Sequence, residues 1–415
     1  MSIDPTHPVP PEFHRVAGID HVPPHVPKEL IRSAGITFAP DFLAAPHDFM
    51  ASMHENFPRI FYDVTPFQNM WTLIRHEDAQ FMLRHPEYFS NEGATPFPRD
   101  PEDYFYFIPI EIDPPDHRKY RAILDPVFSP QAVAQLEDNI RKLANDLIDE
   151  CQENGECEFT TAFGRPLPVS VFLDLMGLPQ EKRDTFVTWA CDLLHSNDQE
   201  IMARTMDLIG GYLKEVIEEK RINPDDRVIS RIVHAEFGDR PIHPKEVFGF
   251  VIFLFIGGLD TVFATMNNIW LWLANNPDGR REIIREPENI ANQLEELLRV
   301  FSVTFSGRMI RKDIEMHGVK MKRGDRVTAC LPAANYDPRV FPNPQKVDFH
   351  RPRKPVLAFA GGVHSCMGAH LARLEIKIGM QEWLRRIPEF SVKPNTQIIY
   401  RPGGVVGPDT LPLAW

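Results

Sequence analysis

The spacing of hydrophobic and polar positions predicts helices through most of the middle of the chain. Apolar residues recur at helical spacing over 169–176, 182–194 and 201–220, which gives each segment one face that can be buried. Another helix is predicted to begin at Ser129-Pro130, because serine is a favoured N-cap residue and proline is favoured in the first turn. Its apolar stripe continues to Leu147.

A long helix is expected from His243 to at least Trp272, and because it is apolar on nearly all sides it should run through the centre of the molecule. The sequence GGLDT over 257–261 interrupts its middle. Each glycine costs a helix about 1 kcal/mol relative to alanine, and the Thr261 hydroxyl can donate to the carbonyl of Gly257 and loosen the helix. Taken alone, the interruption indicates either a functional groove or a close helix crossing.

Short strands are expected where β-favouring residues cluster. Residues 59–74 fit this description and are broken by Pro66, and residues 314–321 alternate like a strand before a turn at 323–325. The glycine-rich segment 403–407 is typical of a hairpin, and it could reach back toward a cavity. The predicted fold class is therefore mainly α with small β-sheets.

Length and composition indicate a proline-rich arm over 1–27 and one large domain over 28–415, because no long Gly/Ser-rich or charged linker divides the 415 residues. The net charge of −13 argues against general nucleic-acid binding. We see no signal peptide, and the apolar run 247–259 is shorter than the roughly 20 residues of a membrane helix. The five cysteines are scattered without paired spacing. We therefore expect a cytoplasmic protein that binds no membrane.

The stretch with the most chemical content is FAGGVHSCMG over 359–368, which leads directly into a predicted helix. Cys366 should lie near the N-terminus of that helix, where partial positive charge favours a thiolate, and a thiolate is a metal ligand. Gly361, Gly362 and Gly368 lack β-carbons, so the loop can lie close to a flat group such as haem. By itself, however, a lone buried cysteine is more often a small hydrophobic residue.

The pattern Phe-x-x-Gly-x-His-x-Cys-x-Gly followed by a helix resembles the haem-binding loop of the cytochrome P-450 superfamily, with Ala360 where a second glycine is more common. The resemblance implies the cytochrome P-450 fold, with haem b held between the long central helix and the helix after the cysteine loop. It also implies that Cys366 is the axial ligand of the haem iron and that His364 contributes to cofactor binding.

The same resemblance implies roles for other motifs. GGLDT is similar to the acid-alcohol pair of the superfamily's oxygen-binding helix, so Thr261 would hydrogen-bond dioxygen and Asp260 would help to relay protons. His117, Arg121 and Arg308 stand where basic side chains of the superfamily meet the haem propionates.

Glu296 and Arg299 match the superfamily's Glu-x-x-Arg motif, which locks the core beneath the haem, and Arg351 is a third member of this group. Read without the resemblance, an acid and a base three residues apart on a helix are usually an exposed pair worth a few tenths of a kcal/mol. The expected role is structural.

The order of motifs along the chain is nearest to that of the bacterial camphor hydroxylase group. Where that enzyme has a tyrosine that donates to the substrate ketone, this chain has Phe105, which cannot donate a hydrogen bond. Ser306 likewise stands in place of an aspartate near a propionate. We therefore expect a compact terpenoid or norisoprenoid, such as a cineole-like cyclic ether or an ionone. The expected substrate pocket consists of Phe97, Phe105, Phe107, Ile110, Phe253, Ile256, Gly257, Thr304, Phe305 and Val405.

The resemblance implies a monomeric haem-thiolate monooxygenase that uses O2. Electrons must come from another protein, because the chain shows no dinucleotide fingerprint, flavin domain or iron-sulfur cysteines. The implied donor is a [2Fe-2S] ferredoxin fed by an NADH-dependent reductase and docked near Arg118. Two alternatives stay open, a haem-thiolate sensor without turnover and a peroxide-driven peroxygenase, and the Asp260-Thr261 pair counts against both.

Overall fold

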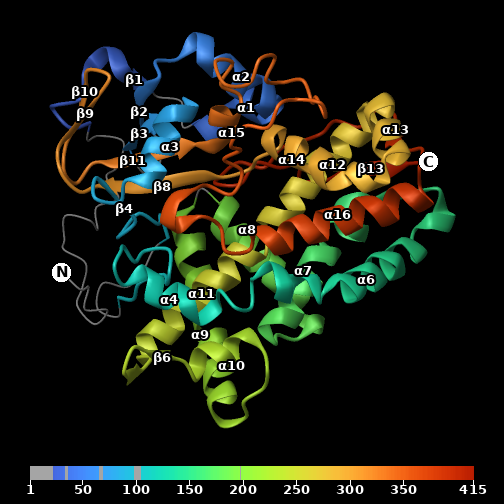
Figure 1. Ribbon diagram of the computed structural model, residues 1–415, viewed down its shortest axis with the longest axis horizontal. Coiled ribbons are helices and arrows are strands. Elements are labelled where there is room, and N and C mark those ends of the chain that lie inside the picture. The colour runs from blue at the N-terminus through green and yellow to red at the C-terminus, as the bar shows by residue number, and fades with distance from the viewer. Residues whose placement is uncertain (1–21, 33–35, 65–68, 98–103, 197) are drawn as a thin grey trace.

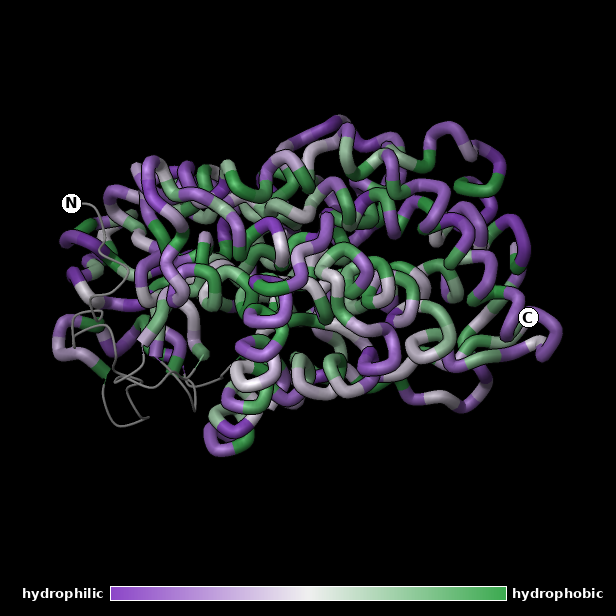
Figure 2. The backbone as a smooth tube through the Cα atoms, turned by 90° about the horizontal axis from the view of Figure 1, so that it is seen from below, coloured by the Kyte–Doolittle hydropathy of each residue, from purple (hydrophilic) through white to green (hydrophobic). Residues whose placement is uncertain are grey.

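The main sheet and most of the long helices occupy different sides of the molecule (Figure 1). The computed structural model describes residues 22–32, 36–64, 69–97, 104–196 and 198–415, so most of the arm expected over 1–27 lies outside the described residues. Hydrophobic segments lie mainly in the interior of the chain trace, and the outer loops are largely hydrophilic (Figure 2). The predicted class, mainly α with small sheets, is confirmed.

The helices carry most of the buried surface. Those predicted over 169–176, 182–194 and 201–220 are confirmed as α7, α8 and α9. The α-helices in the described residues are α1 (Pro40–Ala44), α2 (Pro46–Asn56), α3 (His76–Arg84), α4 (His117–Leu124), α5 (Pro130–Ala134), α6 (Glu137–Asp149), α7 (Pro166–Met176), α8 (Arg183–His195), α9 (Gln199–Ile222), α10 (Val228–Val233), α11 (Pro244–Gly258), α12 (Thr261–Asn275), α13 (Pro277–Arg285), α14 (Ile290–Val300), α15 (Leu331–Asn335) and α16 (Ala369–Arg386).

The single helix predicted from Ser129 to Leu147 is instead two helices, α5 and α6. The predicted N-cap is confirmed, because the Ser129 hydroxyl accepts a hydrogen bond from the backbone N–H of Ala132. Between the helices, the N–H groups of Gln135 and Leu136 donate to carbonyls three residues back. This tighter turn breaks the α-helical ladder and keeps the apolar stripe on one side.

The main sheet has six strands in the order β1-β2-β3-β11-β8-β4, so segments from both ends of the chain meet in it. The strands predicted over 59–74 are confirmed as the antiparallel pair β2 and β3, and β3 then pairs with β11 in parallel. The strands in the described residues are β1 (Ile31–Arg32), β2 (Ile60–Val64), β3 (Asn69–Leu73), β4 (Phe89–Ser90), β5 (Glu156–Glu158), β6 (Glu236–Phe237), β7 (Arg240–Pro241), β8 (Phe305–Ile310), β9 (Ile314–Met316), β10 (Val319–Met321), β11 (Arg326–Cys330), β12 (Ser391–Val392) and β13 (Pro412–Ala414).

The prediction of one strand over 314–321 was wrong, because the segment forms two short strands. It is a hairpin of β9 and β10, because His317 and Gly318 have φ angles of 51° and 82° and turn the chain back on itself. A histidine in the left-handed region gives only a weak signal in the sequence, whereas the predicted turn at 323–325 is marked by Gly324, which also has a positive φ.

The central helix predicted from His243 to Trp272 is a pair of helices, α11 and α12, separated at Leu259 and Asp260. Together they span 32 residues, long and apolar enough to cross a membrane by length and composition. This corrects the expectation that the apolar run is too short for such a span. Two thirds of its most apolar window is nevertheless buried within the protein (67%), as in the core helix of a globular fold.

The aromatic loop before α4 packs directly on α11. The backbone N–H of Ile108 donates to the carbonyl of Gly249 at 3.2 Å. A β-carbon at position 249 would lie 1.9 Å from the carbonyl oxygen of Tyr106, which is far inside van der Waals contact. Glycine is therefore required at this position for the loop to approach the helix.

Candidate active site

An internal cavity of about 320 Å³ lies where α11, α12 and the loop before α16 meet. Apolar side chains make most of its wall, and a smaller group of basic side chains lies in the same wall. The lining includes Phe172, Phe253, Leu254, Val262, Phe301, Val303 and Phe305, together with the basic residues His117, Arg121, Arg308 and His364.

The cysteine loop places Cys366 in this wall. Its backbone N–H donates to the carbonyl of Phe359 at 3.0 Å, which closes the loop just before α16 begins. Ala360 has a φ of 56°, so the residue that departs from the glycine-rich pattern still adopts the left-handed conformation. Gly362 is required, because its φ is 68° and a β-carbon there would lie 2.0 Å from the carbonyl oxygen of Leu83.

Two opposing effects act on the Cys366 thiol in the polypeptide alone, namely burial and the backbone at the start of α16. Cys366 lines the cavity with part of its surface exposed, and burial raises the pKa of its thiol despite the backbone of Gly368 and the charges of Arg121 and Arg373. A metal cation would reverse this balance, because coordination deprotonates a thiol outright.

The basic residues predicted to meet a cofactor all line the cavity. The Arg308 guanidinium is buried and donates to the Ser306 hydroxyl at 2.9 Å and to the Gly307 carbonyl at 2.6 Å. No ion pair to Arg308 occurs among the described residues, and burial lowers its pKa to about 10. Arg121 donates to the carbonyl of Ser365 at 2.8 Å, which joins α4 to the cysteine loop.

Two histidines complete the basic wall. The rings of His117 and His364 lie 4.2 Å apart, and neither ring nitrogen of His364 has a hydrogen-bond partner in the described part of the chain. Burial and neighbouring arginines lower the pKa of His117 to about 4 and that of His364 to about 2. The nearest carboxylate oxygen, on Asp113, is 3.9 Å from Nε2 of His364. Arg121 is paired with Asp125 at 3.0 Å. Arg308 and His364, in contrast, have no hydrogen-bonded carboxylate among the described residues and could be completed by a bound anionic group.

The break between α11 and α12 opens onto the cavity. The Thr261 hydroxyl donates to the carbonyl of Gly257 at 3.4 Å, which confirms the predicted hydrogen bond, and both residues line the cavity. Gly258 has a separate, steric role, because a β-carbon there would lie 2.2 Å from the ring of Phe172. Both glycines therefore line the cavity, and Gly258 in addition permits the close approach of Phe172.

Asp260 is fully buried and does not belong to the cavity lining, in contrast to Thr261. Its Oδ2 lies 2.9 Å from Nε2 of His195, and its Oδ1 lies 3.4 Å from Nη1 of Arg401. Burial alone would raise the pKa of Asp260, but His195, Arg401 and Arg165 hold it below its ordinary value. Neither His195 nor Arg401 lies near Asp260 along the chain, so no sequence pattern marked them as its partners.

The ten residues predicted for the substrate pocket divide into two groups of five. Ile110, Phe253, Gly257, Thr304 and Phe305 line the cavity. The other five lie behind that wall, so their predicted placement is corrected: Phe97, Phe105, Phe107, Ile256 and Val405.

The residues behind the wall support it. Phe105 packs its ring against Phe248 at 4.7 Å and against Phe107 at 5.3 Å, so an aromatic cluster and not the cavity surrounds it. Val405 forms a β-bridge with Thr304, so the glycine-rich C-terminal segment reaches the wall through its backbone.

Glu375 is a cavity residue to which sequence analysis assigned no role. It lies on α16 nine residues after Cys366, is buried, and lines the cavity. Burial raises its pKa well above the ordinary value. An acid on an otherwise amphipathic helix looks solvent-exposed in the sequence, which is why its position was missed.

The predicted structural lock is confirmed. Arg299 is fully buried and donates to both oxygens of Glu296, from Nε at 2.9 Å and from Nη2 at 2.7 Å. Arg351 donates to the same carboxylate at 3.0 Å. Arg299 also donates to the carbonyls of Asn335 and Pro344, and so it ties α14 to the segment that leads to the cysteine loop.

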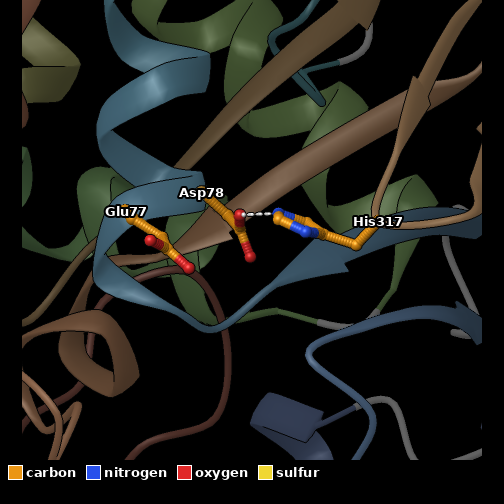
Figure 3. Close-up of side chains that lie close together, drawn as sticks. All are labelled: Glu77, Asp78 and His317. Carbon is orange, nitrogen blue, oxygen red and sulfur yellow. Dashed lines mark hydrogen bonds and ion pairs between the residues drawn. The ribbon is translucent and has the colours of Figure 1, made fainter.

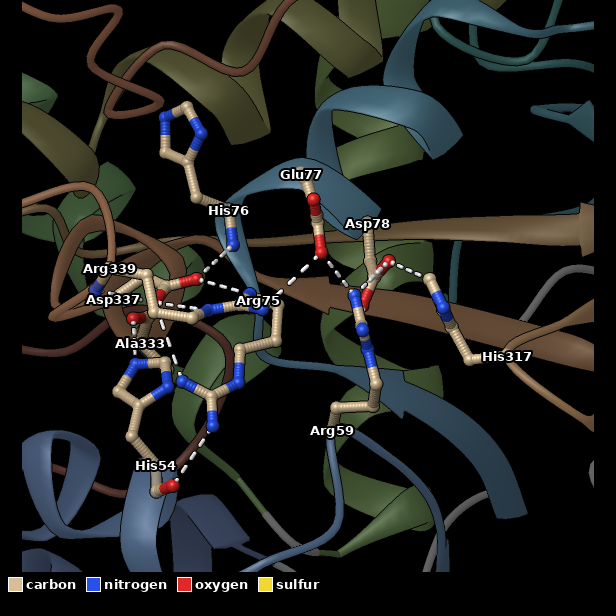
Figure 4. Close-up of polar contacts among 10 residues, drawn as sticks. All are labelled: His54, Arg59, Arg75, His76, Glu77, Asp78, His317, Ala333, Asp337 and Arg339. Carbon is tan, nitrogen blue, oxygen red and sulfur yellow. Dashed lines mark hydrogen bonds and ion pairs between the residues drawn. The ribbon is translucent and has the colours of Figure 1, made fainter.

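A second cluster, made by Glu77, Asp78 and His317, brings three potential metal-ligating atoms together (Figure 3). Arg59 already occupies the centre of this cluster, and its guanidinium donates to Asp78 at 2.9 and 3.0 Å and to Glu77 at 2.5 Å (Figure 4). The carboxylates therefore have a cationic partner, and the cluster is an ion-pair network between α3 and the sheet.

Comparison with known proteins agrees with the geometry of the cavity. Residues 176–407 match the family described as Cytochrome P450. The chain is 34% identical to the probable cytochrome P450 127A1 of Sinorhizobium fredii, over 95% of this chain and 97% of that protein.

Solved structures agree as well. The crystal structure of cytochrome P450 CYP101C1 matches with a TM-score of 0.84 and 27% identity, and that of CYP101J2 with a TM-score of 0.83 and 30% identity. Each comparison covers 95% of this chain, with 100% and 99% of the respective neighbours.

Proposed function

This chain belongs to the cytochrome P450 family, whose members carry haem b on a cysteine thiolate, and from this premise we propose that it inserts one oxygen atom from O2 into a C–H bond of a small apolar terpenoid or norisoprenoid. Membership makes it a monooxygenase. The substrate class, the roles of individual residues and the electron donor are our proposal. The observation that carries it is one apolar cavity that joins Cys366, the Thr261 groove and the basic wall.

The residues present fit haem. Cys366 supplies a sulfur ligand at the start of α16, and Gly362 keeps the loop flat against α3. Arg308, Arg121 and His117 would hold the two propionates, which are anions. His364 would lie beside the same edge. When bound, the haem supplies the oxidising chemistry, and the thiolate favours cleavage of the bond between the two oxygen atoms.

The chain's own contribution is to position groups, exclude water and hold protons. The Thr261 hydroxyl lies in the cavity wall and donates to the carbonyl of Gly257 across the helix break. When the groove holds a ligand, the hydroxyl can turn and donate its hydrogen bond to that ligand. Without a ligand it donates to the carbonyl of Gly257. Asp260, the adjacent residue, is the acid that we assign to proton supply from the protein interior.

The cavity selects substrates by shape and apolarity. Phe253, Phe305 and Val262 present rings and methyl groups. Phe105, which cannot donate a hydrogen bond, lies outside the lining and does not contact the cavity. Thr304 is the polar exception among the predicted wall residues. A compact hydrocarbon skeleton with few polar atoms suits such a wall.

The proposed electron donor is a [2Fe-2S] ferredoxin that receives electrons from an NADH-dependent reductase. Arg118 and Lys119 are exposed at the start of α4, and Arg121 on the same helix bonds to the cysteine loop. Val363 in that loop is 43% exposed. An acidic protein would find basic and apolar contacts together on this face. We further propose a monomeric, single-domain enzyme of the cytoplasm.

The reduced carbonyl complex of the purified holoprotein tests the proposal. We expect the red-shifted Soret band that an axial thiolate produces, and its absence would refute the haem-thiolate assignment. Terpenoids that shift the iron from low to high spin then identify the substrate class. NADH consumption that matches hydroxylated product in the presence of ferredoxin separates a monooxygenase from a sensor, and turnover with peroxide alone would favour a peroxygenase.

A further inference from the structure

Asp260 forms the centre of a buried charged cluster that lies outside the cavity. His195, the last residue of α8, meets its Oδ2, and Arg401 of the C-terminal segment meets its Oδ1. The side chains of Asp260, His195 and Arg401 are only 0%, 7% and 9% exposed. A carboxylate buried this deeply depends on its partners for charge balance.

Both ring nitrogens of His195 face acceptors. Nδ1 lies 2.7 Å from the carbonyl oxygen of Pro402, which can only accept, so Nδ1 carries a hydrogen. Nε2 lies 2.9 Å from the carboxylate of Asp260. A neutral ring has one N–H, and with that hydrogen on Nδ1 its Nε2 lone pair would face a carboxylate lone pair. The hydrogen bond between His195 and Asp260 must therefore hold a second proton.

The surrounding charges decide where this proton rests. Arg401 contacts Cys191 at 3.2 Å and Asp409 at 3.7 Å in addition to Asp260. His195 itself, followed by Arg401 and Arg165, keeps the pKa of Asp260 low in spite of burial. Because Arg401 lies 3.4 Å from Oδ1 and Nδ1 of the ring faces a carbonyl, we assign the negative charge to the carboxylate and the second proton to the ring. The charged and titratable groups that face the pair are Arg401, Arg165, Cys191 and Asp409.

We propose that His195 is the positioning residue that supplies protons to Asp260 during monooxygenation, an inference that rests on the proton-relay role proposed for Asp260. His195 lies at the end of α8, and Asp198, three residues later, is exposed. The His195 side chain keeps 7% of its surface exposed and that of Asp260 none, so the ring is the more accessible member of the pair. Thr261, next to Asp260, borders the cavity.

The step balances as a proton transfer without any change in oxidation state. The N–H bond at Nε2 of His195 breaks and an O–H bond forms at Oδ2 of Asp260, which leaves a neutral ring with its hydrogen on Nδ1 beside Pro402. Asp260 then releases the proton toward the Thr261 side of the helix break. Nε2 regains a proton from hydronium in the solvent, and the pair returns to its starting state.

Nitrogen NMR of the wild-type holoprotein tests the protonation state without turnover. In the diamagnetic ferrous carbonyl form, with histidine labelled with nitrogen-15, both ring nitrogens of His195 should carry hydrogen at neutral pH. The signals are assigned by their loss in His195→Gln, and His54 is the internal reference. Its Nε2 bonds to the carbonyl of Ala333 at 2.7 Å while its Nδ1 has no partner in the described residues, so only one of its nitrogens should carry hydrogen.

A His195 ring with one unprotonated nitrogen would overturn the proposal, and this measurement does not require any variant to be active. The second test compares product formed per NADH as a function of pH. His195→Gln should lower this ratio about 10-fold and remove one ionisation from the pH profile. Haem absorbance and substrate affinity should not change. The matched control is His234→Gln, which replaces an exposed histidine whose ring bonds to the carbonyl of Lys220 at 3.1 Å.

The outcomes separate the two proposals. A missing thiolate Soret band in the wild-type protein would refute the proposed function. A normal band together with fully coupled turnover and an unchanged pH profile in His195→Gln would refute the role of His195 alone, and would make the residue a structural link between α8 and the C-terminal segment.

Discussion

The carboxylate of Asp337, at the end of α15, and the guanidinium of Arg308, in the cavity wall, are both buried, but only the first is paired with opposite charge. Asp337 accepts from the backbone N–H of His76 at 3.1 Å and from Arg339 at 3.0 Å, and Arg75 lies 3.4 Å away (Figure 4). Together these donors lower its pKa to about 2 against the effect of burial. Arg308 instead donates to neutral oxygens.

The difference separates a structural polar cluster from a binding wall. A buried charge with its full set of partners holds elements together. A buried cation with only neutral partners costs free energy unless an anion joins it, and the unbonded nitrogens of His364 lie in the same wall. The paired cluster joins α3 to the segment after α15, whereas we propose that the haem propionates would complete the basic wall.

The largest expected effect comes from removing the metal ligand of the cavity. Cys366→Ser should abolish the red-shifted Soret band and monooxygenation, because a neutral hydroxyl at this position does not replace the thiolate. Absorbance of the reduced carbonyl complex measures the change. Cys157→Ser, on β5 and away from the cavity, is the control and should retain the band. A thiolate spectrum in Cys366→Ser would place the ligand elsewhere.

Breaking the paired cluster around Asp337 should lower the free energy of unfolding and leave the Soret band of the reduced carbonyl complex unchanged. Asp337→Asn should lower the free energy of unfolding by about 2–3 kcal/mol, because Arg339 and Arg75 lose a buried partner. The folded pKa of Asp337 is depressed, so its contribution is present above the ordinary pKa of 3.8 and is lost as pH falls toward about 2. Urea unfolding should therefore show the difference at pH 7 and a smaller difference near pH 3. A constant difference would contradict the assignment.

Removing a charge from the basic wall should weaken haem retention and should not lower the free energy of unfolding of the haem-free protein. Arg308→Met should leave the unfolding free energy of the haem-free protein unchanged or raise it by about 1 kcal/mol, because a buried cation without a carboxylate is removed. The rate of haem transfer to apomyoglobin should rise about 10-fold, since one propionate loses its partner. Lys312→Met, away from the cavity, serves as the control. Unchanged haem retention would remove Arg308 from the cofactor site.

The smallest effect is expected at Phe105. Sequence analysis alone would predict that Phe105→Tyr improves the binding of terpenoid ketones, but the ring lies behind the cavity wall. The change in ketone affinity should therefore be under about 2-fold. Phe253→Tyr, which introduces the same hydroxyl into the lining, should change affinity more. Spectral titration with camphor and an ionone compares the two variants.

The sequence was sufficient to predict features whose interacting residues lie within a few positions of one another in the chain. The cysteine loop, the bond from Thr261 to Gly257 and the Glu296–Arg299 pair each depend on residues close together in the chain. The family resemblance added the distant partners, such as Arg351.

Features set by packing between distant segments were not predictable in this way. Phe105 and Phe253 are both phenylalanine, so the sequence cannot tell which of the two side chains lines the cavity. The fold places Phe253 in the lining and Phe105 behind it. His195 and Asp260 are 65 residues apart, so only the position of the end of α8 beside the helix break brings them together. The sequence also could not show that burial outweighs the helix N-terminus at Cys366.

The contact between Gly249 and the carbonyl of Tyr106 limits how this enzyme can admit its substrate. The N–H of Ile108 in the aromatic segment donates to the carbonyl of Gly249 in α11, and the carbonyl of Tyr106 packs directly against Gly249. Opening an entrance there would break a main-chain hydrogen bond and expose aromatic rings to water at each opening. A methyl group at position 249 would force the aromatic segment away from α11, so the hydrogen atom at that position keeps the two segments in contact.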